Sequence, residues 1–404
     1  MQVYVLCDDA LSLPYQAEHG LSLFIKTNSH NILFDAGRSD AFAKNAALAG
    51  IDLSEIDTVV LSHGHYDHAD GLMHFLQINN RAKIYVHAEA FGDFRHGERY
   101  IGADKRLQAY TDRMVLISED LAIDDTLSVV TADGLQAPQT GLLKRIGNEV
   151  LADDFAHEIY LEVSDTSKKA FFTGCAHKGI VSIANLALRR GATHLIGGFH
   201  LTDTCDAGFL QEAANALADI PLVYYTGHCT SQKAYDCLKR TLQTRLHRLS
   251  DQAAFAIGDH AEVARFLFRQ GYNCSQAVLG AFADELGLDG ELAMRLSCSF
   301  GGGMGRMREV CGAVSGMLMV CGCTDGYSTP ETGAVKAAHY KKVQELAAVF
   351  RERHGSLICR ELLGGSVSNA PTPSARTEEF YRLRPCERLI ASAASIAEEM
   401  LLQK

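Results

Sequence analysis

A histidine-rich stretch at residues 61–71, with the sequence LSHGHYDHADG, carries the side chains best suited to chemistry. In an extended loop His63 and His65 alternate onto one side, and Asp67 and His68 follow as the chain turns into a helix. Neutral imidazoles and a carboxylate suit zinc, iron or manganese, and four ligands this close can serve one or two divalent ions. The spacing therefore predicts a metal site at the end of a strand.

The pattern His-x-His-x-Asp-His after a strand resembles the metallo-β-lactamase superfamily, and the resemblance covers roughly residues 1–258. Three further segments fit it: LFDAG at 33–37, AFFTG at 170–174 and YTGHCT at 225–230. The resemblance implies an α/β fold, an αββα sandwich with its metals at the rim between two sheets. It also implies that His228 is the last histidine ligand and that the aspartate of LFDAG supports the metal loop.

One departure from that superfamily matters chemically. Most members follow the Thr-Gly pair with an aspartate that bridges two metals, whereas Gly174 is followed here by Cys175-Ala-His177. Three interpretations stay open: Cys175 is a thiolate ligand, His177 completes a site, or the second metal is weakly bound or absent. We favour His177 as a ligand and keep Cys175 as a candidate, because a buried cysteine is often inert packing.

The Cys-x-His pattern, with Glu18-His19-Gly20 and GGFHL at 197–201, resembles the branch related to dihydropterin ribofuranosyl-aminobenzene phosphate synthase. Members of that branch are described as metal-dependent hydrolases, so the resemblance fixes no substrate. Two glycines before His200 let a ligand approach the backbone. We predict Glu18, His19 and His200 as substrate contacts, with ordinary hydrogen-bonded side chains as the alternative. Five other histidines are assigned to surface or packing positions: His74, His87, His96, His157 and His194.

These side chains together indicate a hydrolytic site. An ion held by the two histidines of His-x-His and a third histidine lowers the pKa of its bound water toward neutrality. A second ion on Asp67, His68 and His228 would hold the substrate and stabilise a developing oxyanion. Asp67 and His200 are the candidate catalytic residues, with Asp67 as proton acceptor if a single metal binds.

The chain of 404 residues exceeds one ordinary domain, and its pattern changes near residue 258. Before that point β-like runs alternate with helical patterns, and after it amphipathic helices dominate. We predict an α/β domain over 1–258 and a smaller all-α domain over 259–404. The expected strands are 2–8, 21–27, 31–37, 57–62, 83–88, 158–164, 169–174, 193–199, 222–227 and 253–258. The expected helices are 40–48, 180–189, 208–217, 231–242, 261–270, 275–285, 291–296, 334–353 and 386–402.

The second domain holds Cys274, Cys311, Cys359 and Cys386, whose order and context resemble the C-GCAxxG-C-C family, although CGAxxG here reverses two letters of that label. The resemblance implies a helical, redox-active domain. Facing helices can bring distant cysteines together, so a metal site, an iron–sulfur cluster or a dithiol pair are alternatives to simple packing. No strand precedes the glycines at 301–305, so they are no nucleotide fingerprint.

Composition excludes several classes of function. With 49 acidic against 38 basic side chains, the net charge of −11 offers no broad cationic field for nucleic acid or an anionic membrane. The longest uncharged stretch, 310–324, has 15 residues, too few for a membrane span. No secretory signal pattern opens the chain, so we expect a cytoplasmic protein with reduced thiols.

The leading hypothesis is a metal-dependent hydrolase that uses metal-activated water on an ester or phosphoester-type small molecule, fused to a thiol-based redox module. The first alternative is an iron-dependent oxidoreductase, or a sulfur- or electron-transfer enzyme, working with a redox partner protein. The second is a pterin-linked synthase of the transferase type. A third treats the cysteine-rich domain as a redox or metal sensor. Zinc is the first choice of metal, and the sequence carries no signal for the oligomeric state.

Overall fold

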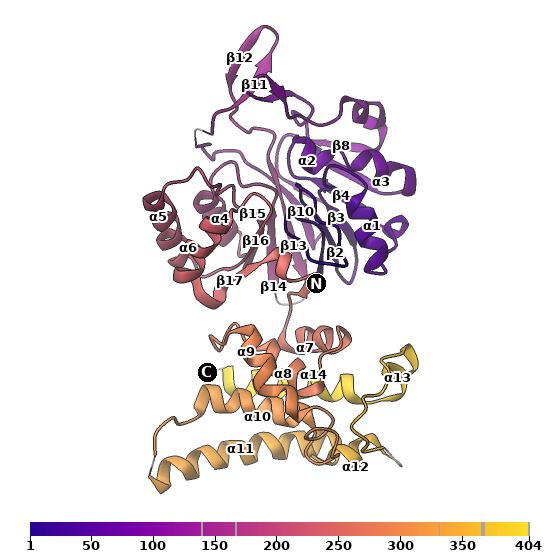
Figure 1. The fold of residues 1–404 in the computed structure, drawn as a ribbon, viewed down its shortest axis with the longest axis vertical. Helices are drawn as coiled ribbons and strands as arrows, with labels where there is room; N and C mark the ends of the chain where they lie inside the picture. Colours follow the sequence, from indigo (N-terminus) through magenta and orange to yellow (C-terminus); the bar gives the residue numbers. More distant parts are fainter. Residues whose placement is uncertain (139, 166–167, 331, 365–367, 403–404) are drawn as a thin grey trace. The chain divides into compact units, whose positions relative to one another are not determined.

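The computed structural model describes residues 1–138, 140–165, 168–330, 332–364 and 368–402. The chain divides into two compact units, Met1–Ile257 and Gly258–Lys404, and each is described here by itself (Figure 1). The first unit is rich in sheet and the second is helical, as the sequence predicts. None of the described helices combines enough length and apolar character to cross a membrane.

The first sheet of unit 1 has the strand order β18-β1-β2-β3-β4-β5-β8. The strands from β18 to β3 are antiparallel, and those from β3 to β8 are parallel. Its strands are β1 (Gln2–Cys7), β2 (Ser22–Lys26), β3 (Asn31–Phe34), β4 (Thr58–Leu61), β5 (Lys83–His87), β8 (Met114–Ile117) and β18 (Ala254–Ala256).

The second sheet has the order β17-β16-β15-β14-β13-β10-β9, with β14 to β17 parallel. Its strands are β9 (Leu121–Ala122), β10 (Leu127–Thr131), β13 (Ile159–Asp165), β14 (Lys168–Thr173), β15 (His194–Gly198), β16 (Val223–Gly227) and β17 (Leu246–Arg248). A small third sheet contains β6 (Asp93–His96), β7 (Arg99–Tyr100), β11 (Leu142–Ile146) and β12 (Glu149–Ala152).

Four layers of structure surround the core of unit 1. Apolar side chains from both large sheets meet in one cluster, where the rings of Phe34 and Phe172 lie 5.9 Å apart. Helices α1 (Ala41–Leu48) and α3 (Leu72–Ile78) cover the outer face of the first sheet, and α4 (Ile180–Arg189), α5 (Ala207–Ala218) and α6 (Gln232–Leu242) cover the second (Figure 1). The αββα sandwich is therefore confirmed.

The parallel strands decide where unit 1 can hold a site. Strands β14, β15 and β16 run in the same direction, so their carboxyl ends meet at one edge of the second sheet. Strands β3 and β4 are also parallel, which sets the loops after both side by side. All the predicted metal ligands of unit 1 lie just beyond these strand ends.

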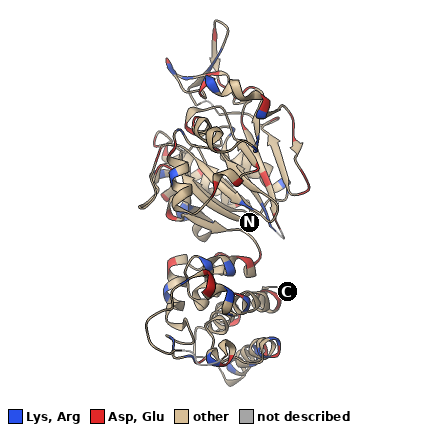
Figure 2. Cartoon of the chain, turned by 90° about the vertical axis from the view of Figure 1, so that its right-hand side faces the viewer, with Lys and Arg blue, Asp and Glu red and all other residues tan. Residues whose placement is uncertain are grey.

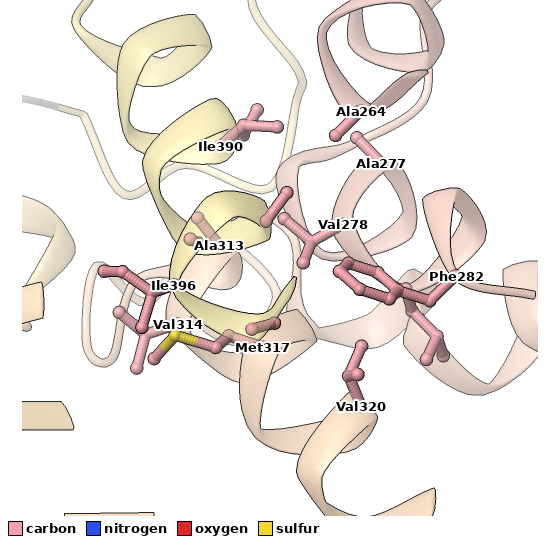
Figure 3. Packing of buried hydrophobic residues seen from close by; sticks show 14 of the residues in the cluster. Ala264, Ala277, Val278, Phe282, Ala313, Val314, Met317, Val320, Ile390 and Ile396 are labelled. Carbon is pink, nitrogen blue, oxygen red and sulfur yellow. The ribbon is translucent and has the colours of Figure 1, made fainter. Parts of the chain in front are cut away.

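Unit 2 is a helical bundle around a small-residue core, part of which is drawn in Figure 3. The helix α10 was not predicted, because three glycines interrupt its apolar pattern. Those glycines permit close packing, since Gly316 lies against the carbonyl oxygen of Ser275 and the side chain of Val278. The helices are α7 (His260–Arg269), α8 (Cys274–Ala281), α9 (Gly290–Ser297), α10 (Gly312–Asp325), α11 (Gly333–His354), α12 (Cys359–Leu363), α13 (Glu378–Leu383) and α14 (Cys386–Ala397).

Replacing Phe282 by alanine is expected to destabilise unit 2 by about 3–5 kcal/mol, the usual cost of emptying a fully buried aromatic site. Phe282 is completely buried in that core, and its ring stacks on the imidazole of His260 at 3.9 Å. Hydrogen exchange of the α8 and α14 amides in the full chain measures the loss. The control is Leu296→Ala at a side chain that is 55% exposed, where we expect a change within about 0.5 kcal/mol. Equal effects of the two substitutions would contradict this assignment of the core.

Figure 2 shows acidic and basic positions interspersed along both units.

Candidate metal centre

Three imidazoles, those of His63, His65 and His177, converge beyond β4 and β14. Their ring centroids lie 4.6 to 5.0 Å apart, and all three side chains are buried. Within the described part of the chain, Nε2 of each ring has no hydrogen-bond partner, and neither has Nδ1 of His177. Burial, reinforced by neighbouring histidines, lowers the pKa of all three, so the rings are neutral.

Leaving buried ring nitrogens without partners costs free energy, and natural proteins rarely leave such groups unsatisfied. A divalent cation removes that cost, because neutral imidazoles offer lone pairs to it. The orphaned nitrogens of His63, His65 and His177 therefore fit a metal ion. His177 was the favoured third histidine, and the structure places it beside the other two.

A second group lies next to the first and consists of His68, Cys175 and His228. Nε2 of His68 is 3.1 Å from the Cys175 sulfur and 3.2 Å from Nε2 of His228. The Asp67 carboxylate approaches Nε2 of His228 to 3.5 Å. The Cys175 sulfur also lies within 4.8 Å of ligand nitrogens of His63 and His177, so it belongs to both groups. This position between the two groups suits a ligand shared by two ions.

A buried carboxylate orients the second group. Asp35 accepts hydrogen bonds from the backbone N–H and the hydroxyl of Ser62 at 2.7 and 2.6 Å. Its Oδ2 lies 2.6 Å from Nδ1 of His68, which fixes the proton on that nitrogen and leaves Nε2 free to face Cys175. The same hydroxyl lies 2.9 Å from Nδ1 of His63, so one short network positions both histidines.

Asp35→Asn is expected to weaken metal binding by about 10- to 100-fold, the usual effect of losing a carboxylate that orients a ligand histidine. The amide keeps the size of the side chain but cannot accept both hydrogen bonds and the His68 proton. Competition with a chromogenic chelator measures the affinity. Asp52→Asn is the matched control, because that carboxylate only caps a short surface turn through Ser54. Unchanged affinity in Asp35→Asn would contradict the orienting role.

Two aspartates near the N-terminus position His228. Its backbone N–H donates to Asp8 at 2.8 Å, and its Nδ1 lies 2.7 Å from Asp9. Burial disfavours a charged His228 ring, but the hydrogen bonds to Asp67 and Asp9 outweigh burial and raise its pKa. Burial works against the charge of Asp67 too, yet bonds from His19 and His228 hold its pKa well below the usual range. So low a pKa suits a ligand carboxylate better than a proton acceptor.

The backbone around the site is held in uncommon conformations. Asp35, Ala176, His200 and His228 all have positive φ, between 43° and 56°. Such strain in non-glycine residues collects at functional sites. Gly174 is required by close approach, because a Cβ there would lie 2.0 Å from the Ser62 hydroxyl. The segment that presents Cys175 is therefore pressed directly onto the loop after β4.

The three predicted substrate contacts have different surroundings. The His200 ring lies 4.4 Å from that of His177, and burial with the nearby His228 lowers its pKa to about 4. His19 lies at the exposed rim, where it contacts Asp67 at 3.3 Å. Glu18 accepts hydrogen bonds from the backbone of residues 38 and 39 and so holds that loop. All three stay predictions as substrate contacts.

Two neighbours of the site were not singled out from the sequence. His157 was assigned to packing or the surface, and it is buried beside His65, where it accepts a hydrogen bond from the Gly64 N–H and contacts Asp153. Both of its nitrogens are therefore engaged. Cys229 accepts from the His200 N–H at 3.1 Å and donates toward the Cys175 carbonyl. The GHCT segment contains this cysteine but gives no signal for that contact.

The donor set limits the choice of metal. Imidazoles with one thiolate suit zinc or iron, whereas manganese prefers oxygen ligands. Two adjacent ions would find His63 and His177 on one side and His68 and His228 on the other, with Cys175 between them. The His65 ring lies 4.6 Å from that of His63, and the Asp67 carboxylate lies 3.5 Å from Nε2 of His228. Such a pair of ions can activate water and hold an anionic or carbonyl-containing substrate.

Fold and site together define a metallo-β-lactamase domain followed by a cysteine-rich helical domain. Residues 16–177 match the family model of the metallo-beta-lactamase superfamily. Residues 272–400 match the family described as "Putative redox-active protein (C_GCAxxG_C_C)". The first domain belongs to the metallo-beta-lactamase superfamily, and the second is a C_GCAxxG_C_C domain.

Two relatives from one organism match part of this chain. An uncharacterised protein of Methanocaldococcus jannaschii is 29% identical over 248 residues, which is 57% of this chain and 91% of that protein. The 7,8-dihydropterin-6-methyl-4-(beta-D-ribofuranosyl)-aminobenzene-5'-phosphate synthase of the same organism is 27% identical over 277 residues, or 62% of this chain and 94% of that enzyme.

A solved structure is also similar. The crystal structure of a metal-dependent hydrolase of the beta-lactamase superfamily has a TM-score of 0.56 and 29% sequence identity. The likeness covers 64% of this chain and all of that one.

Proposed function

We propose that unit 1 is a metal-dependent hydrolase acting on a small ester or phosphoester-type molecule, and that unit 2 is its thiol-based redox module. The observation that carries the proposal is the set of buried, neutral imidazoles of His63, His65 and His177 with unpartnered nitrogens. Beside it, His68, Cys175 and His228 offer a second set of donors. A divalent ion bound there would lower the pKa of a bound water and polarise the substrate.

The protein's own residues would supply position and charge. Asp35 holds the His68 ring with its free nitrogen inward. Asp67 contributes a fixed negative charge, since its pKa lies well below the usual range. His200, neutral because of its lowered pKa, can accept or donate one hydrogen bond to a substrate next to His177. The exposed His19 is suited to meet a substrate at the rim.

Cys175 favours a second candidate function, an iron-dependent oxidoreductase or a sulfur- or electron-transfer enzyme. A thiolate between two ion positions is a soft, redox-capable ligand where a carboxylate is usual. A reducing compartment such as the cytoplasm would keep this thiol available, and all twelve cysteines are free. A redox partner protein would then complete the reaction.

A pterin-linked synthase is the third candidate. It is supported by the relative from Methanocaldococcus jannaschii that carries such a name, at 27% identity. The substrate in each of the three cases is a small molecule.

Metal analysis of anaerobically purified full-length protein, joined to assays on ester and phosphodiester surrogates, separates these candidates. Protein with zinc in unit 1 that cleaves surrogates, and loses this activity to a chelator, supports hydrolysis. Stoichiometric iron in unit 1 with no surrogate cleavage supports the oxidoreductase. Protein that binds no metal in unit 1 would overturn both. Transfer onto a pterin precursor without net hydrolysis would favour the synthase.

A further inference from the structure

Unit 2 contains a cavity of about 290 Å³ whose lining combines thiols with positive charge. The four cysteines singled out in the sequence all line it. So do four arginines, and none of the described residues in the lining is Asp or Glu. The structure therefore turns four cysteines spread over more than a hundred residues into one site. The arginines are Arg306, Arg308, Arg376 and Arg384.

Each of the four cysteines lies at the beginning of a helix. Cys274 and Cys386 are the first residues of α8 and α14, Cys311 is the N-terminal cap of α10, and Cys359 opens the short α12. The N–H groups at the start of α10 and α14 have no side-chain cap, and they favour negative charge on a nearby sulfur. Burial raises the pKa of the Cys274 thiol, and the Gly302 backbone N–H opposes that shift.

The four thiols lie near one another. Burial raises the pKa of Cys274, Cys311 and Cys386, and every pairing among the four cysteines adds to these shifts. Yet among the described residues no three of their sulfurs lie within 4.8 Å of each other. A single tetrahedral zinc with bonds of about 2.3 Å needs sulfurs roughly 3.8 Å apart. The wider spacing fits a polynuclear centre better than one ion.

The side chain of Arg308 shows which charge the cavity lacks. This residue is only 5% exposed, although it carries a permanent positive charge. Its Nε donates to the Ser368 carbonyl at 2.9 Å, and its Nη1 lies 4.0 Å from the Cys359 sulfur. Its Nη2 has no partner in the described part of the chain. A buried guanidinium without a counter-charge is costly, so an anionic group next to it is expected.

We propose that Cys274, Cys311, Cys359 and Cys386 ligate an iron–sulfur cluster in this cavity, with Arg308 donating a hydrogen bond to it. Four thiolates bring negative charge to a cavity lined by arginines and helix starts, and sulfide atoms accept hydrogen bonds. Gly312 is consistent with this crowding, because a Cβ there would lie 2.3 Å from the Cys274 sulfur. The proposal rests on the redox role proposed for unit 2 and is independent of the reaction of unit 1.

The test is anaerobic purification of the full chain, followed by iron and acid-labile sulfide analysis and visible absorbance. We expect broad visible absorbance that bleaches with dithionite, and sulfide in proportion to iron. The same measurements are made on the His63→Ala/His65→Ala variant, in which the substitutions remove any iron bound by unit 1. Sulfide should persist there while surrogate hydrolysis is lost, so failures of the two proposals are distinguishable.

Substitution of each cysteine by serine locates the ligands. Each of the four variants should lose at least about half of the sulfide, because a cluster lacking one of its thiolates is poorly held. Cys298→Ser is the control inside the cavity lining, where the thiol is exposed, and Cys323→Ser is the control outside it. Both should keep the cluster. Colourless protein with stoichiometric zinc, a disulfide among the four, or no sulfide after reconstitution with iron and sulfide would each overturn the proposal.

Arg308 is a positioning residue, and the reduction potential reports on it. Arg308→Met removes a positive charge beside the centre, so the reduced, more negative form is destabilised and the potential should fall. Arg308→Lys keeps the charge and should restore most of the potential. A merely structural role would change cluster content without this difference, and equal potentials in the three proteins would overturn the assignment of Arg308.

Discussion

The His63→Ala/His65→Ala variant is expected to lose surrogate hydrolysis by about 10³-fold or more, because a bound ion supplies several kcal/mol and each 1.36 kcal/mol is a factor of ten. These two rings provide two of the four unpartnered imidazole nitrogens at the first ion position. The ion bound at that position should be lost with the activity. Measurement of kcat/KM together with metal stoichiometry checks both parts.

The control for this double variant is His96→Ala, at an exposed residue of β6. It should retain both activity and metal. Circular dichroism of the double variant should show the wild-type fold, since the two rings lie at loop positions beyond β4. Activity that survives the double substitution would refute a role of this site in either enzymatic reaction.

Cys175→Ala is expected to weaken metal binding at one or both ion positions by about 10²-fold or more. Residues that only orient a ligand contribute up to about 100-fold, and a direct ligand should contribute at least as much. The Cys175 sulfur is common to the two donor groups. Burial raises the pKa of this thiol, so it ionises only when a cation takes the place of the proton. Cobalt-loaded wild-type protein should therefore show thiolate-to-metal charge-transfer absorption that Cys175→Ala lacks.

Two further variants sharpen the Cys175 result. Cys175→Asp replaces the thiolate by a carboxylate and should retain both ions and hydrolysis within about tenfold, because oxygen also ligates zinc. It should lose the charge-transfer absorption. Cys237→Ala, at a buried cysteine in the α6 core, is the control and should leave metal binding unchanged. If Cys175→Ala behaved like Cys237→Ala, Cys175 would be packing.

Much of the sandwich follows from local patterns in the sequence. The buried strands β1 to β5 and β13 to β16 appear as short apolar runs, and helices α4, α5 and α6 appear as amphipathic patterns. The strands β10 and β8, with the sequences LSVVT and MVLI, were missed, although Asp133-Gly134 follows the first and marks a turn. The hairpin β11–β12 carries mixed polar side chains and reads as a loop.

The site was predictable where its residues are close in sequence, and less so elsewhere. The His-x-His-x-Asp-His spacing alone predicts a cluster of metal-ligating side chains, and the structure brings these side chains together. The contact of Asp9 with His228 joins residues 219 positions apart, and no local pattern indicates it. The same holds for the cavity in unit 2, where four helix starts converge. That convergence depends on the packing of α10, and the glycines of α10 interrupt the apolar pattern that would predict the helix.

The pairing of β1 with β18 has a consequence for synthesis. These strands are the first and last of unit 1, and the Met1 amino group also bonds to the Ile257 carbonyl at 2.6 Å. At about 5–20 residues per second, β1 pairs early with β2 but waits roughly 13–50 s on the ribosome for its other neighbour, β18. His228, whose ring Asp9 holds, also emerges late. Unit 1 should therefore acquire its ions only after its last strand has been made, while unit 2 is being translated.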